Sequence, residues 1–435
     1  MWAENSVFYQ IYPLGFCGAP EENDGVTVPR IRRVAEWAEH IQRLGCNALY
    51  LCPVFDSDRH GYDTRDYRRV DPRLGTNEDL RYVVDTLHAH GIRVVLDAVF
   101  NHVGRGFWAF RDVQEHRWDS PYRDWFRLSF DGDSPYGDGF WYEGWEGHYE
   151  LVKLNLRNGQ VADYLLDCVR FWAENFDIDG LRLDVAYCLE PDFLRSLRSF
   201  TDGLREEFFL LGETLHGDYN RWMGDGMLHS VTNYECYKGL YSAFNSMNLF
   251  EIVHSLKRQF GPEYWTLYKG RHLLSFADNH DVTRIATQLQ NKAHLPLVYG
   301  MLFAMPGIPC VYYGSEWGLD GDKRQGDRVL RPELQVPEWN GLTDRIAAMA
   351  RIHRESEALC WGGFRELVLT NRQTVFCRQS EHQRVLLAVN ADSAPYTARF
   401  DAGCGVLRDM ETGEEFAFSG FLELPPYSCR FLECR

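Results

Sequence analysis

Eight strand-like runs, most of them separated by helical patterns, constrain this chain more than any other feature. Each run is short and apolar, and the segments between them space their apolar residues as helices do, as in Arg30–Leu44 and in Leu80–His90, which Gly91 ends. Alternating strands and helices predict a parallel sheet, and eight such units predict a closed (β/α)8 barrel, an α/β fold. The eight runs are Val7–Leu14, Ala48–Val54, Val94–Phe100, Gly180–Val185, Phe208–Glu213, Ser230–Tyr234, Leu273–Ala277 and Pro309–Tyr313.

Two segments break this rhythm. Residues 104–155, after the third strand, are rich in Gly, Trp, Tyr and Asp and show little periodicity, so we predict a small inserted domain. Residues 358–435 hold alternating runs separated by turn signals, which predicts a C-terminal antiparallel β-sandwich domain. The barrel is then formed by residues 1–103 and 156–357.

Composition narrows the class of protein. The formal net charge of −17 argues against nucleic acid as a partner, because phosphates would be repelled. No apolar stretch is long enough to span a membrane, and the N-terminus lacks a basic-then-apolar leader. The 12 cysteines are scattered without metal-like spacing, so we expect reduced thiols, no metal site and a cytoplasmic protein.

Three of the strand-like runs end in a carboxylate: GLRLD at Asp184, FLLGE at Glu213 and SFADNHD at Asp281. In a parallel barrel the C-terminal ends of all strands meet on one face, so these side chains would converge on one pocket. Converging carboxylates repel one another, which is costly unless chemistry requires them. Glycosidic bond cleavage, which uses a paired acid and nucleophile, is the chemistry that such a group predicts.

The first two carboxylates suit different roles. Arg182 and Asp184 are two apart on one strand and point the same way, so the guanidinium would lower the pKa of Asp184 and keep it ionised as a nucleophile. Glu213 lies in an apolar setting that would raise its pKa, as a general acid and base requires. The structural alternatives are an Arg–Asp pair and a carboxylate at a helix N-terminus.

Polar residues near the other strand ends complete the predicted pocket. His280 and Asp281 could bind two sugar hydroxyls, and Tyr62, next to Asp63 in the loop after the second strand, could stack beneath a sugar ring. The alternative for Tyr62 and Asp63 is ordinary turn chemistry.

The run DAVFNH, at the third strand end, supplies three more residues. Asp97 and Asn101 are interpreted as strand-end and loop support, and His102 follows them.

The runs DAVFNH, GLRLDVA, LLGET and FADNHD, in this order, resemble the four conserved regions of the α-amylase family of glycoside hydrolases. The resemblance covers the whole chain. It implies that Asp184 is the nucleophile, Glu213 the acid/base and Asp281 the transition-state stabiliser, in a reaction that retains anomeric configuration. It also implies that the sugar is bound by Tyr62, Asp63, His102, Arg182 and His280.

Within the family, VKLN (Val152–Asn155) and YRDWF (Tyr122–Phe126) are similar to segments of neopullulanases and cyclomaltodextrinases. Many α-amylases have a Lys–His pair in the segment where this chain has Val185–Cys188. Many also hold a structural calcium with an Asn at the position of Asn101. We predict no required cofactor, although the oxygen-rich run 131–138 remains a candidate for calcium.

The predicted function is hydrolysis of α-1,4, and also α-1,6, glucosidic bonds in maltooligosaccharides or α-glucans. A transglycosylase, isomerase or phosphorylase of the same family is an alternative, because the covalent intermediate can pass to a sugar hydroxyl or to phosphate. A non-catalytic binding protein on the same fold is a third interpretation. The sequence determines neither endo versus exo action nor the oligomeric state.

Overall fold

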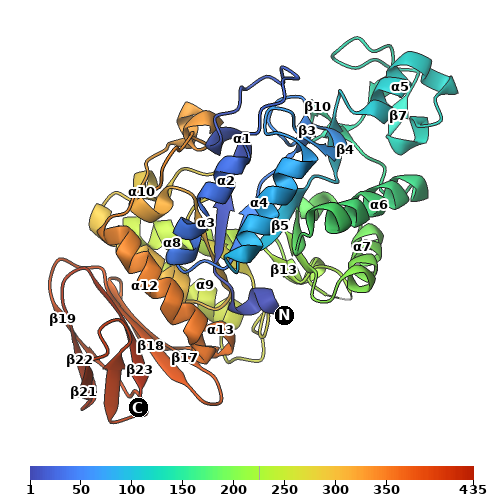
Figure 1. Cartoon of the computed structure of the whole chain (residues 1–435). Coiled ribbons are helices and arrows are strands. Elements are labelled where there is room, and N and C mark those ends of the chain that lie inside the picture. The colour runs from blue at the N-terminus through green and yellow to red at the C-terminus, as the bar shows by residue number, and fades with distance from the viewer. Residues whose placement is uncertain (225) are drawn as a thin grey trace.

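The computed structural model of the chain describes residues 1–224 and 226–435. Its centre is a sheet of eight parallel strands in the order β13-β12-β11-β5-β2-β1-β15-β14 (Figure 1). A parallel bridge between Thr232 and Leu274 joins the two ends of this sheet and closes it into a barrel. The predicted eight-stranded barrel is therefore confirmed. Its strands are β1 (Phe8–Ile11), β2 (Ala48–Leu51), β5 (Arg93–Ala98), β11 (Gly180–Leu183), β12 (Phe209–Gly212), β13 (Ser230–Val231), β14 (Leu274–Phe276) and β15 (Ile308–Tyr312).

Helices cover the outside of the barrel, so its strands are buried on both faces. One of them, α4, begins with a capping box: the Thr76 hydroxyl accepts the Asp79 N–H and the Asp79 carboxylate accepts the Thr76 N–H. Gly91, with φ of +71°, follows its end. The helices are α1 (Pro13–Phe16), α2 (Arg32–Glu36), α3 (Ala38–Arg43), α4 (Asn77–Ala89), α6 (Gly159–Phe176), α7 (Pro191–Leu204), α8 (Tyr234–Asn245), α9 (Phe250–Phe260), α10 (Ile285–Gln288), α11 (Leu295–Ala304), α12 (Gly341–Glu355) and α13 (Glu357–Trp361).

Two local features depart from a regular strand–helix repeat. The helical pattern predicted over Arg30–Leu44 is present but interrupted, because a turn at Trp37 divides it into α2 and α3. The buried Trp37 indole packs there against Phe16 and Trp317, with ring centroids 4.8 and 6.0 Å away. The connection from β12 to β13 holds, in its described residues, only the short 3-10 helix η5 (Tyr219–Arg221).

The inserted domain follows β5 and contains a small antiparallel sheet in the order β6-β10-β9. Strand β10 pairs with β6 through Val152 and Val103, which places the insertion beside the barrel strand ends (Figure 1). Its elements are β6 (His102–Gly104), α5 (Trp108–His116), β7 (Leu128–Ser129), β8 (Trp141–Tyr142), β9 (Gly144–Trp145) and β10 (His148–Lys153). A hairpin of β3 (Phe55–Ser57) and β4 (Thr64–Val70) follows β2 on the same side.

The C-terminal domain is antiparallel, with a six-stranded sheet in the order β16-β17-β18-β23-β20-β21 and a second sheet of β19 and β22. A separate apolar core that includes Leu386, Ala398 and Leu424 lies within it. Its first strand begins at Gly363, after α13. The strands are β16 (Gly363–Leu369), β17 (Gln373–Gln379), β18 (Arg384–Asn390), β19 (Tyr396–Arg399), β20 (Val406–Asp409), β21 (Glu415–Ala417), β22 (Phe421–Leu424) and β23 (Ser428–Cys434).

All twelve cysteines are unpaired thiols, nine of them buried. In the described part of the chain, no helix has the length and apolar character needed to cross a membrane.

Candidate active site

A cavity of about 1210 Å³ lies at the C-terminal ends of the barrel strands. It is larger than the about 300–1,000 Å³ of pockets that hold drug-sized ligands. Residues from the barrel loops, the inserted domain and the loop after β15 line it. Of the residues predicted from the sequence, those that line it are Tyr62, His102, Asp184, Glu213 and Asp281.

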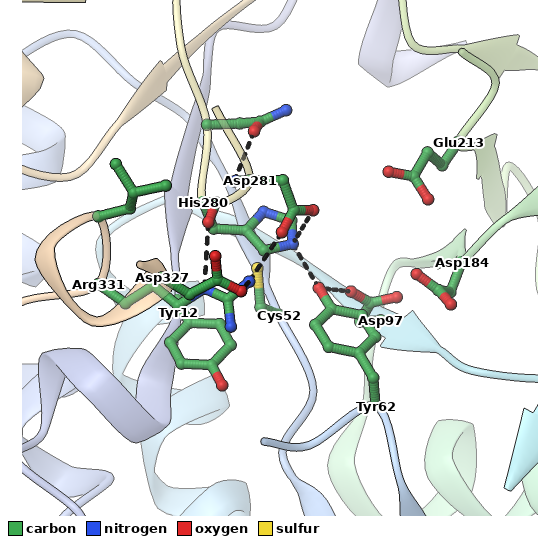
Figure 2. Close-up of polar contacts among 12 residues, drawn as sticks. Tyr12, Cys52, Tyr62, Asp97, Asp184, Glu213, His280, Asp281, Asp327 and Arg331 are labelled. Atoms are coloured by element: carbon green, nitrogen blue, oxygen red, sulfur yellow. Dashed lines mark hydrogen bonds and ion pairs between the residues drawn. The ribbon is translucent and has the colours of Figure 1, made fainter. Parts of the chain in front are cut away.

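Arg182 organises the base of this cavity. Strand register places it beside Asp97 on β5, and Arg182 Nη1 donates to both oxygens of Asp97, at 2.9 and 3.0 Å. Nη1 also donates to Asp184 Oδ1 at 2.8 Å, and Nη2 lies 2.9 Å from Glu213 Oε1. We call Arg182 with Asp97, Asp184 and Glu213 the carboxylate floor (Figure 2). Its side chains are at most 8% exposed.

The strand backbone fixes the two carboxylates that face the cavity. The Asp184 N–H donates to Ala98 O at 3.1 Å, and the Glu213 N–H donates to Leu183 O at 2.9 Å. Both residues thus continue the sheet ladder directly past the ends of β11 and β12. Their side chains point to the same side of the sheet because they occupy equivalent positions on neighbouring parallel strands.

Val185, the next residue after Asp184, has a left-handed backbone with φ of +38°. This conformation is unfavourable for a β-branched side chain, and such strain is found mainly where function requires it. Here it turns the Val185 N–H toward Glu213, to whose Oε2 it donates at 3.0 Å. The Tyr234 hydroxyl reaches Oε1 of the same carboxylate at 3.4 Å.

Burial raises the pKa of Asp184, and the neighbouring Glu213 and Asp97 carboxylates add to this effect against the opposing Arg182. The expectation that Arg182 would lower the pKa of Asp184 overall is therefore wrong. One guanidinium compensates three carboxyl groups incompletely in a water-poor site. Asp184 consequently binds a proton more readily than an isolated carboxylate does.

A second group lies beside the floor, formed by Tyr62, His280, Asp281 and Arg331 (Figure 2). The Tyr62 hydroxyl is 3.1 Å from Asp97 Oδ2 and 2.6 Å from His280 Nε2. His280 Nε2 is also 2.9 Å from Asp281 Oδ2, and Arg331 Nη2 donates to Asp281 Oδ1 at 2.7 Å. Asp281 is 37% exposed and so faces the cavity from between two cations.

These ion pairs set the charge of the second group. Burial alone would lower the pKa of His280, but Asp281 outweighs it and raises that pKa to about 10. Burial alone would raise the pKa of Asp281, but His280 and Arg331 hold it below its usual range. His280 is thus a cation and Asp281 an anion at neutral pH.

His102 presents a free donor to the cavity. Its Nδ1 lies 3.1 Å from the Asn101 side-chain amide, which assigns the ring proton to Nε2. Nε2 is 3.9 Å from Asp184 Oδ2, too far for a hydrogen bond, and has no other partner among the described residues. Burial lowers the pKa of His102 to about 3, so the ring stays neutral. A buried donor without a partner suits a hydroxyl of a bound sugar.

Three of the residues predicted to bind the sugar lie behind the cavity wall rather than on it. Arg182 and His280 act on the carboxylates described above. Asp63 is buried, and its carboxylate accepts the His60 N–H at 3.1 Å, so the structure places it as support for its own loop. His60 itself lines the cavity and was not predicted.

Sequence reasoning also missed one residue from a loop without a strand-end signal and one that directly follows the first barrel strand. They are Arg331, whose partner is Asp281, and Tyr12, whose ring stacks on His280 with centroids 6.1 Å apart. The HGY run at His60–Tyr62 was a usable signal for His60. Arg331 follows no motif, so no local pattern could have identified it.

In residues 1–224 and 226–435, no group of three or more His, Cys, Asp or Glu side chains is arranged to hold a metal ion. In the acidic run 131–138, Asp138 is paired instead with Arg105 Nη2 at 2.8 Å and accepts the Ser134 hydroxyl. The absence of a required cofactor remains a prediction.

Asp184 and Glu213 lie at neighbouring strand ends of a parallel barrel, and both contact Arg182 at the base of a cavity. A pair of carboxyl groups facing one cavity is what glycosidic bond cleavage requires. A family model for the alpha amylase catalytic domain matches residues 10–358. The chain therefore belongs to the α-amylase family and is an enzyme of the glycoside hydrolase class.

Relatives sharpen the position within the family. A cyclomaltodextrinase from a Bacillus species is 31% identical over 92% of this chain and 75% of its own length. Neopullulanase 2 from Thermoactinomyces vulgaris is 31% identical over 95% of this chain and 74% of its own. The cyclic alpha-maltosyl-(1→6)-maltose hydrolase from Arthrobacter globiformis superposes with a TM-score of 0.84 at 28% identity, covering both chains completely. The predicted likeness to neopullulanases and cyclomaltodextrinases is confirmed.

Proposed function

We propose that this enzyme is a retaining hydrolase of α-1,4 and α-1,6 glucosidic bonds in maltooligosaccharides. The observation that carries the proposal is the carboxylate floor, in which Asp184 and Glu213 share Arg182 at the base of a large cavity. We expect their carboxyl groups to be separated by about 5–5.5 Å when substrate is bound, as retention requires.

The first step of the proposed reaction breaks the glycosidic bond. Glu213 donates its proton to the bridging oxygen while an Asp184 oxygen bonds to the anomeric carbon, so the leaving sugar departs as an alcohol. This step requires the free enzyme to hold a proton on Glu213 and to keep Asp184 ionised. The contact from Arg182 Nη1 to Asp184 Oδ1 at 2.8 Å works toward this, against the rise in the pKa of Asp184 that burial causes. The Val185 N–H and Arg182 orient the Glu213 carboxyl throughout.

The second step returns the enzyme to its starting state. Glu213, now ionised, takes a proton from water, whose oxygen attacks the anomeric carbon and displaces Asp184. Positive charge that develops on the sugar ring in both steps is stabilised by the ionised Asp281. His102 Nε2–H and Tyr62 are positioned to hold the sugar against these groups.

The names of the relatives support the substrate class. They include cyclomaltodextrinase, maltogenic alpha-amylase and neopullulanase, all hydrolases rather than transferases or phosphorylases. A second candidate substrate is cyclic α-maltosyl-(1→6)-maltose, for which the Arthrobacter hydrolase is named. The full-length structural match to that enzyme favours it. The net charge of −17 is compatible with such neutral sugars.

We also propose a cytoplasmic location. The twelve unpaired thiols support it, as does a 31% identical Bacillus subtilis relative named intracellular maltogenic amylase.

The test is product analysis on maltotriose, panose, pullulan, a cyclodextrin and cyclic maltosyl-maltose, with the wild type and Asp184→Asn. We expect short sugars from the wild type and a loss of at least about 10³-fold in the variant. In Asp184→Ala, azide should restore bond cleavage and give the β-glycosyl azide, since azide enters from the face that Asp184 occupies. Full activity of Asp184→Asn, or no hydrolysis of any of these sugars by the wild type, would refute the proposal.

A further inference from the structure

The two ends of the cavity differ in what they can bind. The leaving sugar must lie beside Glu213, which protonates it, and this end is lined by Tyr187 and Leu215. The further units of the glycone therefore occupy the opposite end, beyond Tyr62 and Asp281. Figure 2 shows Tyr12 and Arg331 on that side, away from Asp184 and Glu213. The cavity-lining residues of this end, which we call the glycone wall, lie in the segments 18–21, 59–60, 327–328 and 331–333, the last two belonging to one loop.

A single buried side chain, Arg73, joins two of the three loops of this wall. Its Nη1 lies 3.0 Å from Pro20 O and 2.7 Å from Glu21 O, in the loop after β1. The same nitrogen lies 2.7 Å from Arg59 O, in the hairpin after β2. Arg73 is fully buried, while the segments that it holds line the cavity.

The rest of the guanidinium is fixed from below. Arg73 Nε and Nη2 donate to the two oxygens of Asp71 at 2.9 and 2.7 Å, and Nη2 also donates to the Ser57 hydroxyl at 2.9 Å. Ser57 Oγ in turn accepts the Gly61 N–H at 3.1 Å. A buried, fully satisfied charge network of this kind is rigid, because any opening leaves a charge unpaired.

The remaining loop meets the loop after β1 directly. Gly18 has a left-handed backbone with φ of +66°, which favours glycine, and a Cβ there would lie 2.5 Å from the Glu333 carboxyl carbon. Arg33 pairs with Glu333 at 2.8 Å, and Arg59 pairs on the outer surface with Glu21 at 3.1 Å. The glycone wall is therefore continuous across three loops.

We infer that Arg73 is a specificity-positioning residue, which holds the glycone wall closed and thereby limits how many sugar units fit beyond the cleaved bond. The enzyme then acts from the non-reducing ends of linear chains and releases one dominant short product, rather than cutting internally. This inference rests on the proposed hydrolase function. Arg73 is a positioning residue and not a catalytic one, since it acts only through the backbone of Pro20, Glu21 and Arg59.

The experiment maps the bonds cut in p-nitrophenyl α-maltohexaoside by chromatography. The wild type should cut mainly at one fixed distance from the non-reducing end. Arg73→Lys keeps a charge for Asp71 but cannot reach all three carbonyl oxygens. In this variant, cuts farther from the non-reducing end should increase about tenfold relative to the dominant cut. Tenfold is the lower end of the discrimination that one pocket contact contributes. Hydrogen exchange over residues 17–28 should rise in parallel, and KM for long chains should change more than kcat.

Arg378→Lys is the matched control. Arg378 is also buried and donates to carbonyl oxygens, those of Ala304 and Gly362, but it lies at the junction with the C-terminal domain. It should lower stability and leave the cutting pattern unchanged. Should Arg73→Lys fail to fold, Arg59→Ala removes the outer ion pairs from an exposed position and should broaden the pattern in the same direction.

Two outcomes would overturn the inference while the hydrolase function stands. One is random internal cutting by the wild type. The other is an unchanged cutting pattern in a folded Arg73→Lys in which hydrogen exchange over residues 17–28 has risen. No cleavage of any glucan by the wild type would instead refute the proposed function, and this inference with it.

Discussion

The carboxylate floor and the glycone wall are built around one buried arginine each, and they differ in what that arginine holds. Arg182 contacts three carboxylates, all at or beyond strand ends. Arg73 contacts one carboxylate, a hydroxyl and three backbone carbonyls of loops. The contacts of Arg182 determine the charge of the catalytic carboxylates, whereas the contacts of Arg73 determine the shape of one end of the cavity. Changes at the floor should therefore affect the chemical step, and changes at the wall should affect which bond reaches it.

The strongest test of this contrast is Arg182→Lys. A lysine cannot bind Asp97, Asp184 and Glu213 together, so the two reacting carboxylates lose the group that holds them in position. We expect kcat to fall by about 10³-fold or more, judged from the about 10²–10³-fold cost of one transition-state donor. Steady-state kinetics on maltotriose measures this, with Arg378→Lys as the control for a buried arginine. A change in KM alone would contradict the contrast.

Arg331→Ala probes a residue that belongs to the wall but contacts the second charged group. Without its contact at 2.7 Å, the pKa of Asp281 should rise toward its ordinary value, and the acid limb of kcat/KM should move to higher pH. We expect a loss of about 10-fold at neutral pH, less than a direct donor costs. A pH–rate profile of the variant and the wild type measures the position of this acid limb. An acid limb at its original position would show that Arg331 contributes only to shape.

His280→Gln tests the same group through stability. The raised pKa of His280, about 10, contributes stability that is fully present below the unfolded value of about 6.5 and is lost as the pH rises through about 10. The variant should therefore lower Tm clearly at pH 6 and much less at pH 10, as measured by scanning calorimetry. An equal loss at both pH values would indicate a packing role without an ion pair.

Val185→Gly should have the smallest effect. Glycine keeps the N–H that binds Glu213 and relieves a left-handed strain of about 1–3 kcal/mol, which offsets the lost side-chain burial. We expect activity within about threefold of the wild type and a stability change below about 1 kcal/mol, since gain and loss are of similar size. The matched variant Val95→Gly, in an ordinary strand conformation, should lose about 2 kcal/mol or more in urea unfolding. Equal losses in both variants would show that the Val185 backbone is not strained.

The floor was predictable because strand periodicity and strand ends are local patterns. Arg182 and Asp184 share a face because they are two residues apart, and Glu213 joins them because its strand is the next in a parallel sheet. The wall was not predictable in this way. Arg73 and Pro20 are far apart in sequence, and no periodicity relates a buried guanidinium to a loop carbonyl.

The pKa of Asp184 shows the same division. The sequence placed a guanidinium beside it, which predicts a lowered pKa, and the structure has that contact at 2.8 Å. Burial and two further carboxylates nevertheless raise it. Desolvation depends on everything that surrounds a group, so neighbours along one strand do not determine its sign.

The sequence by itself determined the barrel, the inserted and C-terminal domains, and the identity of the carboxylates at the barrel strand ends. It could do so because short runs of residues are enough to show hydrophobic periodicity and the positions of strand ends. Tertiary structure alone decided which groups lie behind these carboxylates. It decided that Asp63 supports a loop, that Arg331 pairs with Asp281, and that Arg73 joins two loops that line the cavity. The contacts of Arg331 and Arg73 join different loops at the barrel opening. These loops come into contact because the whole sheet closes into a barrel, and no local sequence pattern determines that.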